Sequence, residues 1–440
     1  MATTGKLRPL LVMSALLTAL FALTAPSLAA GGAKAATGGA LGPGTRFYVP
    51  KPNHDAVRQI AALTSQGRKD EAARIRTMSD TPTAVWVEGG SPKAAEQQTR
   101  QVTHQAAGKK TLPVLVLYNI PFRDCAQYSA SGATSMAEYT AWIDGVARGI
   151  GDRAALVVLE PDGLGIIPWY TSINGQLEWC QPAEADPATA AAERFAMLSY
   201  AVDKLAALPN TRVYLDGTHS GWLGADDIAD RLLKAGVARA DGFFLNASNY
   251  HYTQNLVHYG TWISSCLAYV TLVNPGGFGS CGNQYWSGGP ANDWDGVQLS
   301  PYGLWSDTAP TPELNTAGLT SRYAQILGGV APTTPFIIDT SRNGQGPWNP
   351  TGYGFPDPQD WCNPPGRGVG ARPTADTGHP LVDVYVWIKV PGESDGQCSR
   401  GLGAGDNVVD PIWGRVDPDA GVWFPEQALE LASRASPPLR

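Results

Sequence analysis

The 440-residue sequence has little charge and lacks the motifs of several large classes of protein. Only 16% of its residues are charged, and 39 acidic residues outnumber 32 basic ones. Without a basic excess the chain has no surface suited to a phosphate backbone, so the composition argues against a nucleic-acid partner. The sequence also has no Walker phosphate-binding loop and no close Cys-x-x-Cys pair, and its six His are scattered, which argues against a metal site.

The first 30 residues predict a secretory signal peptide. Lys6 and Arg8 form its basic start, residues 10–25 its apolar stretch and residues 27–30 its small-residue cleavage site. The apolar stretch is shorter than the ~20 residues that a membrane-spanning helix needs. We therefore expect a secreted, extracellular monomer without a membrane partner after signal removal.

The rest of the chain predicts one linker and one large domain. Residues 31–45 are rich in Gly and Ala and lack apolar periodicity, which is typical of a linker. No internal repeat and no comparable second linker occurs in residues 46–440, so this span is expected to fold as a single domain.

Short β-branched and apolar runs alternate with segments of helical periodicity, as in a parallel sheet with connecting helices. Helices are expected at 138–150, where apolar residues recur at i, i+3, i+4 and i+7, and at 188–208. The predicted strands are residues 84–87, 113–118, 155–159, 212–215, 242–245, 335–338 and 382–388.

Each predicted strand is followed by polar residues. These are Glu88; Asn119 and Asp124; Glu160 and Asp162; Asp216; Asn246; Asp339 and Arg342; and Lys389, Glu393 and Asp395. Any one of them could simply begin a loop. Together they predict one shared site, because active sites of α/β barrels are built at the C-terminal ends of the strands.

The residues around these positions form a series of motifs that resembles a known family. In chain order they are Tyr118-Asn119-Ile120-Pro121, Arg123-Asp124-Cys125, Glu160-Pro161-Asp162, Tyr214-Leu215-Asp216 through His219 to Trp222, Asn246-Ala247-Ser248-Asn249-Tyr250, Asp339-Thr340-Ser341-Arg342-Asn343-Gly344, Trp361-Cys362-Asn363, Trp387-Ile388-Lys389 and Gly392-Glu393-Ser394-Asp395-Gly396. This series resembles glycoside hydrolase family 6, a family of secreted cellulases. The resemblance covers about residues 47–424.

The resemblance implies a distorted, incomplete α/β barrel of about seven parallel strands, with an active-site cleft at the strand C-termini. It also implies hydrolysis of β-1,4-glucosidic bonds in cellulose or a related β-glucan, with inversion at the anomeric carbon. No cofactor is expected, since protonation of the leaving group and activation of water need none.

The family's catalytic residues match four positions. Asp162 resembles the general acid, and Asp124 resembles the carboxylate that keeps it protonated and steers the water. Asp395 matches the base proposed for the family, and Tyr118 matches the tyrosine that crowds the reacting sugar. The family's water-relay Ser falls on Ala130 here, so Ser129 or Ser131 must substitute for it, or the relay differs.

Eight further positions match sugar-binding residues of the family. They are Trp86, Asp216, His219, Trp222, Asn246, Trp361, Lys389 and Glu393. The alternatives are a buried salt bridge for Asp216 and Glu393, and core packing for Trp86 and Trp222. Glu160 and Asp339 are assigned to support of the scaffold.

The six cysteines form an even set, and an oxidising compartment favours three disulfides over metal binding. The resemblance implies Cys125 with Cys180 and Cys362 with Cys398, which leaves Cys266 with Cys281. The last pair lies in residues 251–318, a stretch without regular periodicity that we predict to be a rim insertion. Its aromatic residues Tyr285, Trp286, Trp294 and Trp305 are expected to lengthen the cleft.

Internal attack on the glucan is favoured over attack from chain ends, because the segment after Asp124 is compact and Cys398 closely follows Asp395. The long stretch 399–422 instead resembles the chain-end-acting cellobiohydrolases of the family. A catalytically inactive carbohydrate-binding protein is a third reading, which the presence of all three aspartates opposes. Action on another β-glucan or on the producer's own wall polymers stays open.

Overall fold

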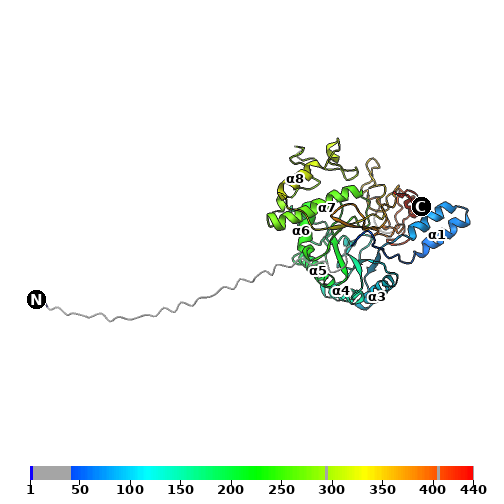
Figure 1. The fold of residues 1–440 in the computed structure, drawn as a ribbon, viewed down its shortest axis with the longest axis horizontal. Helices are drawn as coiled ribbons and strands as arrows, with labels where there is room; N and C mark the ends of the chain where they lie inside the picture. Colours follow the sequence, from blue (N-terminus) through cyan, green and yellow to red (C-terminus); the bar gives the residue numbers. More distant parts are fainter. Residues whose placement is uncertain (3–40, 293–295, 404–406, 440) are drawn as a thin grey trace. The chain divides into compact units, whose positions relative to one another are not determined.

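The seven predicted strands are present and form one parallel sheet. The computed structural model describes residues 1–2, 41–292, 296–403 and 407–439 (Figure 1). Within it the strands pair in chain order from β1 to β7, each parallel to its neighbours. They are β1 (Val85–Glu88), β2 (Val114–Tyr118), β3 (Ala155–Leu159), β4 (Thr211–Asp216), β5 (Gly242–Leu245), β6 (Phe336–Asp339) and β7 (Val382–Val386). The sheet curls into a half-barrel, which confirms the predicted α/β fold.

Helices connect the strands and flank the sheet. The two predicted helices are α4, which begins two residues earlier than predicted, and α5, which is two residues shorter at each end. The α-helices are α1 (His54–Ser65), α2 (Lys69–Ser79), α3 (Pro92–Gly108), α4 (Met136–Ile150), α5 (Ala190–Ala206), α6 (Ala225–Ala235), α7 (Thr253–Ala268), α8 (Ala317–Leu327) and α9 (Pro425–Ser433). Short 3-10 or π turns are η1 (Asp124–Ala126), η2 (Val237–Arg239), η3 (Tyr269–Val273), η4 (Phe278–Ser280) and η5 (Pro312–Leu314).

The sheet is buried on both faces, which explains why its strands read as continuous apolar runs. Side chains alternate along each strand. In β2, Leu115 and Leu117 belong to the core between sheet and helices, together with Trp142 of α4. Val116 and Tyr118 belong to a second cluster formed by side chains from β2, β3, β4, β5, β6 and β7. The inner cluster therefore forms the floor on which a site at the strand ends is built.

Hydrogen bonds join residues at the two edge strands of the half-barrel, β1 and β7. Ala84 N donates to Trp387 O at 2.8 Å, just before β1 and just after β7. The Trp86 indole donates to Ile388 O at 2.9 Å. These bonds bring the residues that follow β7 next to β1, so side chains from the first and last strands can share one site.

The beginning and the end of the described domain lie side by side, as the blue and red segments of Figure 1 show. Helices α1, α2 and α9 form a separate apolar cluster with Trp387 and Trp423. The Trp423 indole donates to Gln59 Oε1 at 2.7 Å, and Gln59 Nε2 donates to Pro425 O at 2.9 Å. The predicted signal peptide and most of the predicted linker lie outside the described residues.

The stretch 251–318 is helical in its first part and irregular, apart from the short turns η4 and η5, from residue 274 to α8. It begins with α7 and the π turn η3, and this helical span, Thr253–Val273, is the one described helix with the length and composition to cross a membrane. It is 67% buried within the domain, as a core helix is. Its periodicity is weak because side chains on nearly all sides, including Tyr259, Trp262 and Ile263, are buried.

We predict that α3 and α4 can pack only with glycine at position 145. A Cβ on Gly145 would lie 2.1 Å from Pro92 O, at the start of α3. Gly145→Ala should therefore destabilise the domain by about 1–3 kcal/mol, although alanine is the better helix former. Thermal or denaturant unfolding measures this change.

The matched control is Gly108→Ala in α3. A Cβ there meets nothing within 4 Å. This variant should be neutral or up to ~1 kcal/mol more stable. Equal stability of Gly145→Ala and Gly108→Ala would contradict the close helix contact.

Candidate active site

A cleft of about 950 Å³ opens at the C-terminal ends of the strands. Its wall contains ten of the twelve predicted catalytic and sugar-binding residues. They are Trp86, Tyr118, Asp124, Asp162, His219, Trp222, Trp361, Lys389, Glu393 and Asp395. Ser129 also lines the cleft, whereas Ser131 pairs with Arg123 in an isolated β-bridge.

The other two predicted residues, Asp216 and Asn246, lie buried behind the wall rather than in it. The Asp216 carboxylate accepts hydrogen bonds from Thr218 N at 2.9 Å and Gly165 N at 3.2 Å. The Asn246 amide donates to Asp339 O at 2.8 Å and accepts from His251 N at 3.0 Å. Both side chains hold loops in place because their polar atoms are committed to backbone groups.

The carboxylates assigned to the scaffold do support it. Asp339 accepts four backbone N–H groups at 2.9–3.1 Å, from Ser248, Ser341, Ile388 and Lys389. Glu160 is fully buried and accepts the N–H groups of Asn119 at 2.9 Å and Ile120 at 3.0 Å. Burial raises the pKa of Glu160 to about 7, although these bonds oppose the shift.

The backbone is strained where the acidic residues enter the cleft. Asp124, Glu160 and Asp162 have φ values of 58°, 53° and 62°, which residues with a Cβ seldom adopt. Such conformations persist only where surrounding contacts fix them, and they concentrate at functional sites. The buried Arg194 guanidinium fixes two of these turns, since it donates to Gly163 O at 2.8 Å and to Pro121 O at 2.7 Å.

Asp162 lies in a setting that favours its protonated form. Burial raises the pKa of its carboxyl well above the usual range, and the negative charges of Asp216 and then Asp124 raise it further. In the described part of the chain no group donates a hydrogen bond to its carboxylate. Asp162 can therefore keep a proton near neutral pH and give it to a bound molecule.

Asp124 follows β2 and faces the same cleft. Burial raises its pKa to about 6, while a hydrogen bond from Ser129 N, at 2.6 Å, and the charge of Arg123 lower it. Near neutral pH it is mostly ionised. Its negative charge then opposes ionisation of Asp162.

Asp395 lies in the opposite electrostatic setting. Burial alone would raise its pKa, but Arg342 and Lys389 outweigh burial and hold the pKa below its usual value. Arg342 Nη1 lies 2.8 Å and Lys389 Nζ 3.4 Å from the carboxylate. Asp395 also accepts from Asn363 N at 3.0 Å and Tyr250 Oη at 3.1 Å. Asp162 and Asp395 thus have pKa values pushed in opposite directions, as in an acid and base pair.

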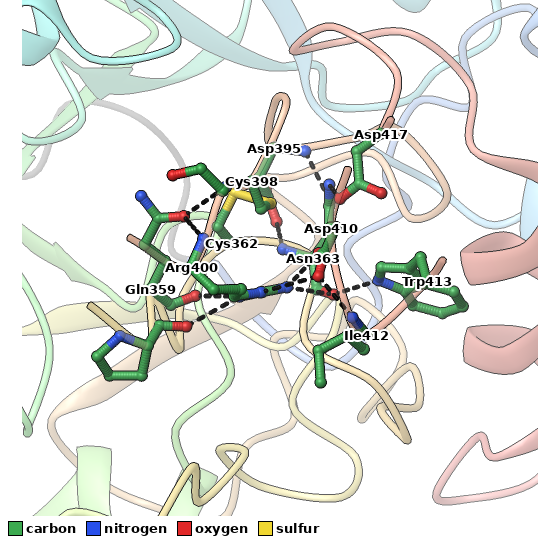
Figure 2. A network of polar contacts seen from close by, with 12 residues as sticks. Gln359, Cys362, Asn363, Asp395, Cys398, Arg400, Asp410, Ile412, Trp413 and Asp417 are labelled. Carbon is green, nitrogen blue, oxygen red and sulfur yellow. Dashed lines mark hydrogen bonds and ion pairs between the residues drawn. A yellow bond between two sulfur atoms is a disulfide. The ribbon is translucent and has the colours of Figure 1, made fainter. Parts of the chain in front are cut away.

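A buried network behind Asp395 fixes its position (Figure 2). The Asn363 side-chain amide accepts from Asp395 N at 2.8 Å and donates to Asp417 Oδ2 at 2.9 Å. Burial raises the pKa of Asp417 to about 7, and a hydrogen bond with Asp410 raises it too. Arg400 binds the Asp410 carboxylate at 2.8 Å. Asp417 is therefore protonated at mildly acidic pH.

The same network holds the one group among the described residues whose donor atoms are close enough for a metal ion, Cys398, Asp410 and Asp417. Cys398 is bonded to Cys362, so its sulfur is not a thiolate. Asp410 is paired with Arg400. These residues do not fit a metal ion.

Aromatic side chains form much of the cleft wall. Trp86 meets Tyr118 edge to face, with ring centroids 5.5 Å apart. Trp222 lies near His219, which stacks on His251 at 4.2 Å. Burial lowers the pKa of both His residues, that of His251 to about 4, so the pair is neutral near neutral pH. An apolar, uncharged wall of this kind suits the faces of sugar rings.

Lys389 and Glu393 line the cleft beside Asp395. Lys389 Nζ also donates to Ser394 O at 2.9 Å, and Glu393 Oε1 accepts from Asn53 Nδ2 at 3.0 Å. Burial raises the pKa of Glu393, and the charge of Lys389 lowers it. Their remaining polar atoms can reach a neutral, hydroxyl-rich ligand.

Three disulfides are present, with the predicted pairs. Cys125–Cys180 joins the loop after β2 to the loop after β3, and Cys362–Cys398 joins the loops after β6 and β7. Cys266–Cys281 ties the end of α7 to the segment that follows it.

The predicted cleft-lengthening role of 251–318 is only partly met, because Pro301 and Tyr302 line the cleft while Tyr285, Trp286 and Trp305 do not. Trp305 is fully buried, and Trp286 is exposed outside the wall formed by the described residues. The Tyr285 hydroxyl donates to Trp222 O at 2.5 Å. Trp294 lies outside the described residues.

Two short strings match motifs of other enzyme classes and have structural roles here. Residues 392–396 match the G-x-S-x-G pattern of serine hydrolases, but the Ser394 hydroxyl is buried and donates to Pro418 O at 2.7 Å. Residues 277–282 match the G-x-G-x-x-G pattern, but they form the turn around η4 rather than a link from strand to helix.

Sequence reasoning placed Arg342 at the shared strand-end site without a specific role, and it assigned no site role to Asn363 or Trp179. Arg342 and Asn363 occur in the quoted motifs, but only the fold brings them to Asp395. Trp179 precedes Cys180, and its place at the cleft depends on the disulfide to Cys125.

Comparisons with known proteins agree with this geometry. The sequence profile of the family described as "Glycosyl hydrolases family 6" matches residues 43–435. The chain is 31% identical to endoglucanase A of Thermobispora bispora, over 96% of this chain and 70% of that protein. It is 32% identical to endoglucanase 1 of Streptomyces halstedii, over 88% of each.

A solved structure is similar as well. It is the endoglucanase Cel6 of Mycobacterium tuberculosis in complex with methyl-cellobiosyl-4-deoxy-4-thio-β-D-cellobioside. The two chains share 30% identity with a TM-score of 0.59, and the match covers 89% of this chain and 97% of the other.

We predict that protonation of Asp417 makes the domain more stable at acidic pH. Its pKa rises from 3.8 in the unfolded chain to about 7 in the folded one. Between these values only the folded state holds the proton, so this contribution is complete below pH 4 and is lost as pH rises to 7. Asn at 417 can still accept from Asn363 and donate to Asp410, but it does not titrate.

Unfolding of the wild type and Asp417→Asn at several pH values measures this effect. The stability of the variant relative to wild type should improve by about 1–3 kcal/mol between pH 4 and pH 8. A difference that does not change with pH would contradict the protonated Asp417.

Proposed function

Because this chain belongs to family 6 of the glycosyl hydrolases, an inverting family of cellulases, we propose that it is a secreted endoglucanase that cleaves internal β-1,4-glucosidic bonds of cellulose. The observation that carries the proposal is the opposed protonation of Asp162 and Asp395 in one aromatic-lined cleft. Secretion is supported by the predicted signal peptide and by three disulfides that leave no free cysteine in the described chain.

In the proposed reaction Asp162 donates its proton to the glycosidic oxygen as the bond from that oxygen to the anomeric carbon breaks. A water attacks the same carbon from the opposite face, which inverts the configuration. The proton of this water passes to Asp395 or along waters to Asp124, whose neighbour Ser129 lines the cleft. The protein thus gives one proton to the leaving oxygen and takes one from the attacking water.

The cleft wall supports the recognition of a neutral glucan. Trp86, Trp222 and Trp361 offer surfaces for the faces of sugar rings, and Tyr118 crowds the reacting ring. Lys389 and Glu393 offer a donor and an acceptor for hydroxyl groups. His219 adds an uncharged polar group to the wall.

One observation favours the alternative of a chain-end-acting cellobiohydrolase. Tyr128, in the loop after β2, contacts residues from two other rim loops. Its hydroxyl lies 3.3 Å from Gln359 Nε2, its ring lies 5.9 Å from that of Trp361, and a Cβ on Gly396 would meet it at 2.5 Å. A closed roof over the cleft would exclude internal segments of a glucan. With these contacts in place, endo action therefore requires the rim loops to open.

We predict that Asp162→Asn removes most activity on cellulose, because the leaving alkoxide then has no proton donor. A loss of about 10²–10⁴-fold is expected on unactivated glucan, and a much smaller one on an aryl glucoside that leaves without protonation. The exposed Asp152→Asn is the matched control. Equal losses on both kinds of substrate would argue against Asp162 as the acid.

We predict rapid loss of viscosity on carboxymethylcellulose relative to the reducing ends released. Internal cuts shorten the polymer early, whereas chain-end cuts release sugar while viscosity persists. Tyr128→Ala, which removes the contacts between rim loops, should leave this ratio unchanged if the wild type already admits internal segments. If the wild type keeps viscosity high and Tyr128→Ala lowers it, the wild type instead acts from chain ends because its rim is closed.

A further inference from the structure

Trp179 is an exposed tryptophan at the wall of the cleft that none of the assigned roles includes. Its side chain is 52% exposed, and it lines the same cleft as Asp162 and Trp222. A large apolar surface left in water is unfavourable unless it meets a partner. The side chain also belongs to a short apolar rim, since Ile173 and Leu177 of the same segment are exposed at 38% and 52%.

The backbone that carries Trp179 is held firmly on both sides. Cys180, the next residue, is bonded to Cys125, the residue after Asp124. Glu178, the preceding residue, accepts from Arg231 Nη2 at 2.6 Å and donates its N–H to Tyr170 O at 2.8 Å. The Trp179 side chain is therefore exposed on a fixed backbone, in place to contact a ligand.

Arg231 connects this segment to the turn that carries the acid. Its guanidinium is almost fully buried, and Nη1 donates to Leu164 O at 3.0 Å, two residues after Asp162. On the same turn, a Cβ on Gly165 would lie 2.4 Å from Trp222, so the Trp222 ring rests against this glycine. Trp179 therefore has a fixed relation to both the acid and Trp222, on the β3–β4 side of the cleft.

We propose that Trp179 forms an additional glucan-binding subsite, which stacks on a glucosyl ring beyond the one at Trp222. The proposal rests on the proposed glucanase function. The ligand class is a β-1,4-linked chain long enough to reach from Asp162 past Trp222, because sugar rings present apolar faces that match an exposed indole. Trp179 contributes to chain-length preference and not to the chemical step.

The test measures kcat and KM for cello-oligosaccharides of increasing length with the wild type, Trp179→Ala and Trp179→Phe. Trp179→Ala should raise KM about 3–10-fold for chains that reach the subsite, leave kcat unchanged, and leave shorter chains unaffected. Trp179→Phe keeps an aromatic face and should restore most of the affinity. The matched control is Trp286→Ala, which removes a tryptophan of similar exposure, 56%, outside the cleft wall.

Equal effects of Trp179→Ala at every chain length, no effect at any length, or the same effect from Trp286→Ala would overturn the subsite. Hydrolysis at no length by the wild type would instead overturn the proposed function. Calorimetric titration of the same oligosaccharides into the same variants would then decide the subsite separately, since stacking needs no turnover. Unfolding curves of the variants verify that each is folded.

Discussion

The site depends on carboxylates that are buried at the ends of parallel strands and held there by backbone N–H groups. Asp339 collects four such donors, Glu160 two and Asp216 three. A buried carboxylate without such partners would cost several kcal/mol, so each one forces the loop around it into a defined path. Asp124, Glu160 and Asp162, whose φ values are positive, lie on loops held in this way.

The same burial gives chemically identical side chains different protonation. Asp162 faces the charges of Asp216 and Asp124 in a setting that no described group relieves with a hydrogen bond. Asp395 is as deeply placed but faces Arg342 and Lys389. Neighbouring charge therefore decides which carboxyl carries the proton. Burial makes the resulting difference in pKa larger, because water screens charges weakly in the interior.

The rim is irregular, yet it is tied to the barrel at many points. Two disulfides connect loops that leave different strands, Arg231 of α6 binds the segment after β3, and Arg400 of the loop after β7 binds the loop after β6. The network of Asn363, Asp410 and Asp417 uses the C-terminal segment to hold Asp395 from behind. Long loops can in this way present aromatic side chains, Trp179 among them, on a fixed backbone.

The sequence by itself determined the seven strands, the parallel α/β class, the three disulfide pairs and the polar residues at the strand ends. The strands, the fold class and the strand-end residues follow from local apolar runs and from motifs whose residues are close in the chain, whereas the resemblance to family 6 implied the disulfide pairs. The sequence did not distinguish α7 from a loop, because a helix buried on nearly all sides shows little periodicity. It also did not reveal that Asp216 and Asn246 are buried behind the cleft wall with polar atoms bonded to backbone groups. Only the tertiary structure decided which strand-end residues face the cleft, which charges set the protonation of each aspartate, and which tryptophans remain exposed, because each of these depends on charges and contacts from segments far apart in the chain.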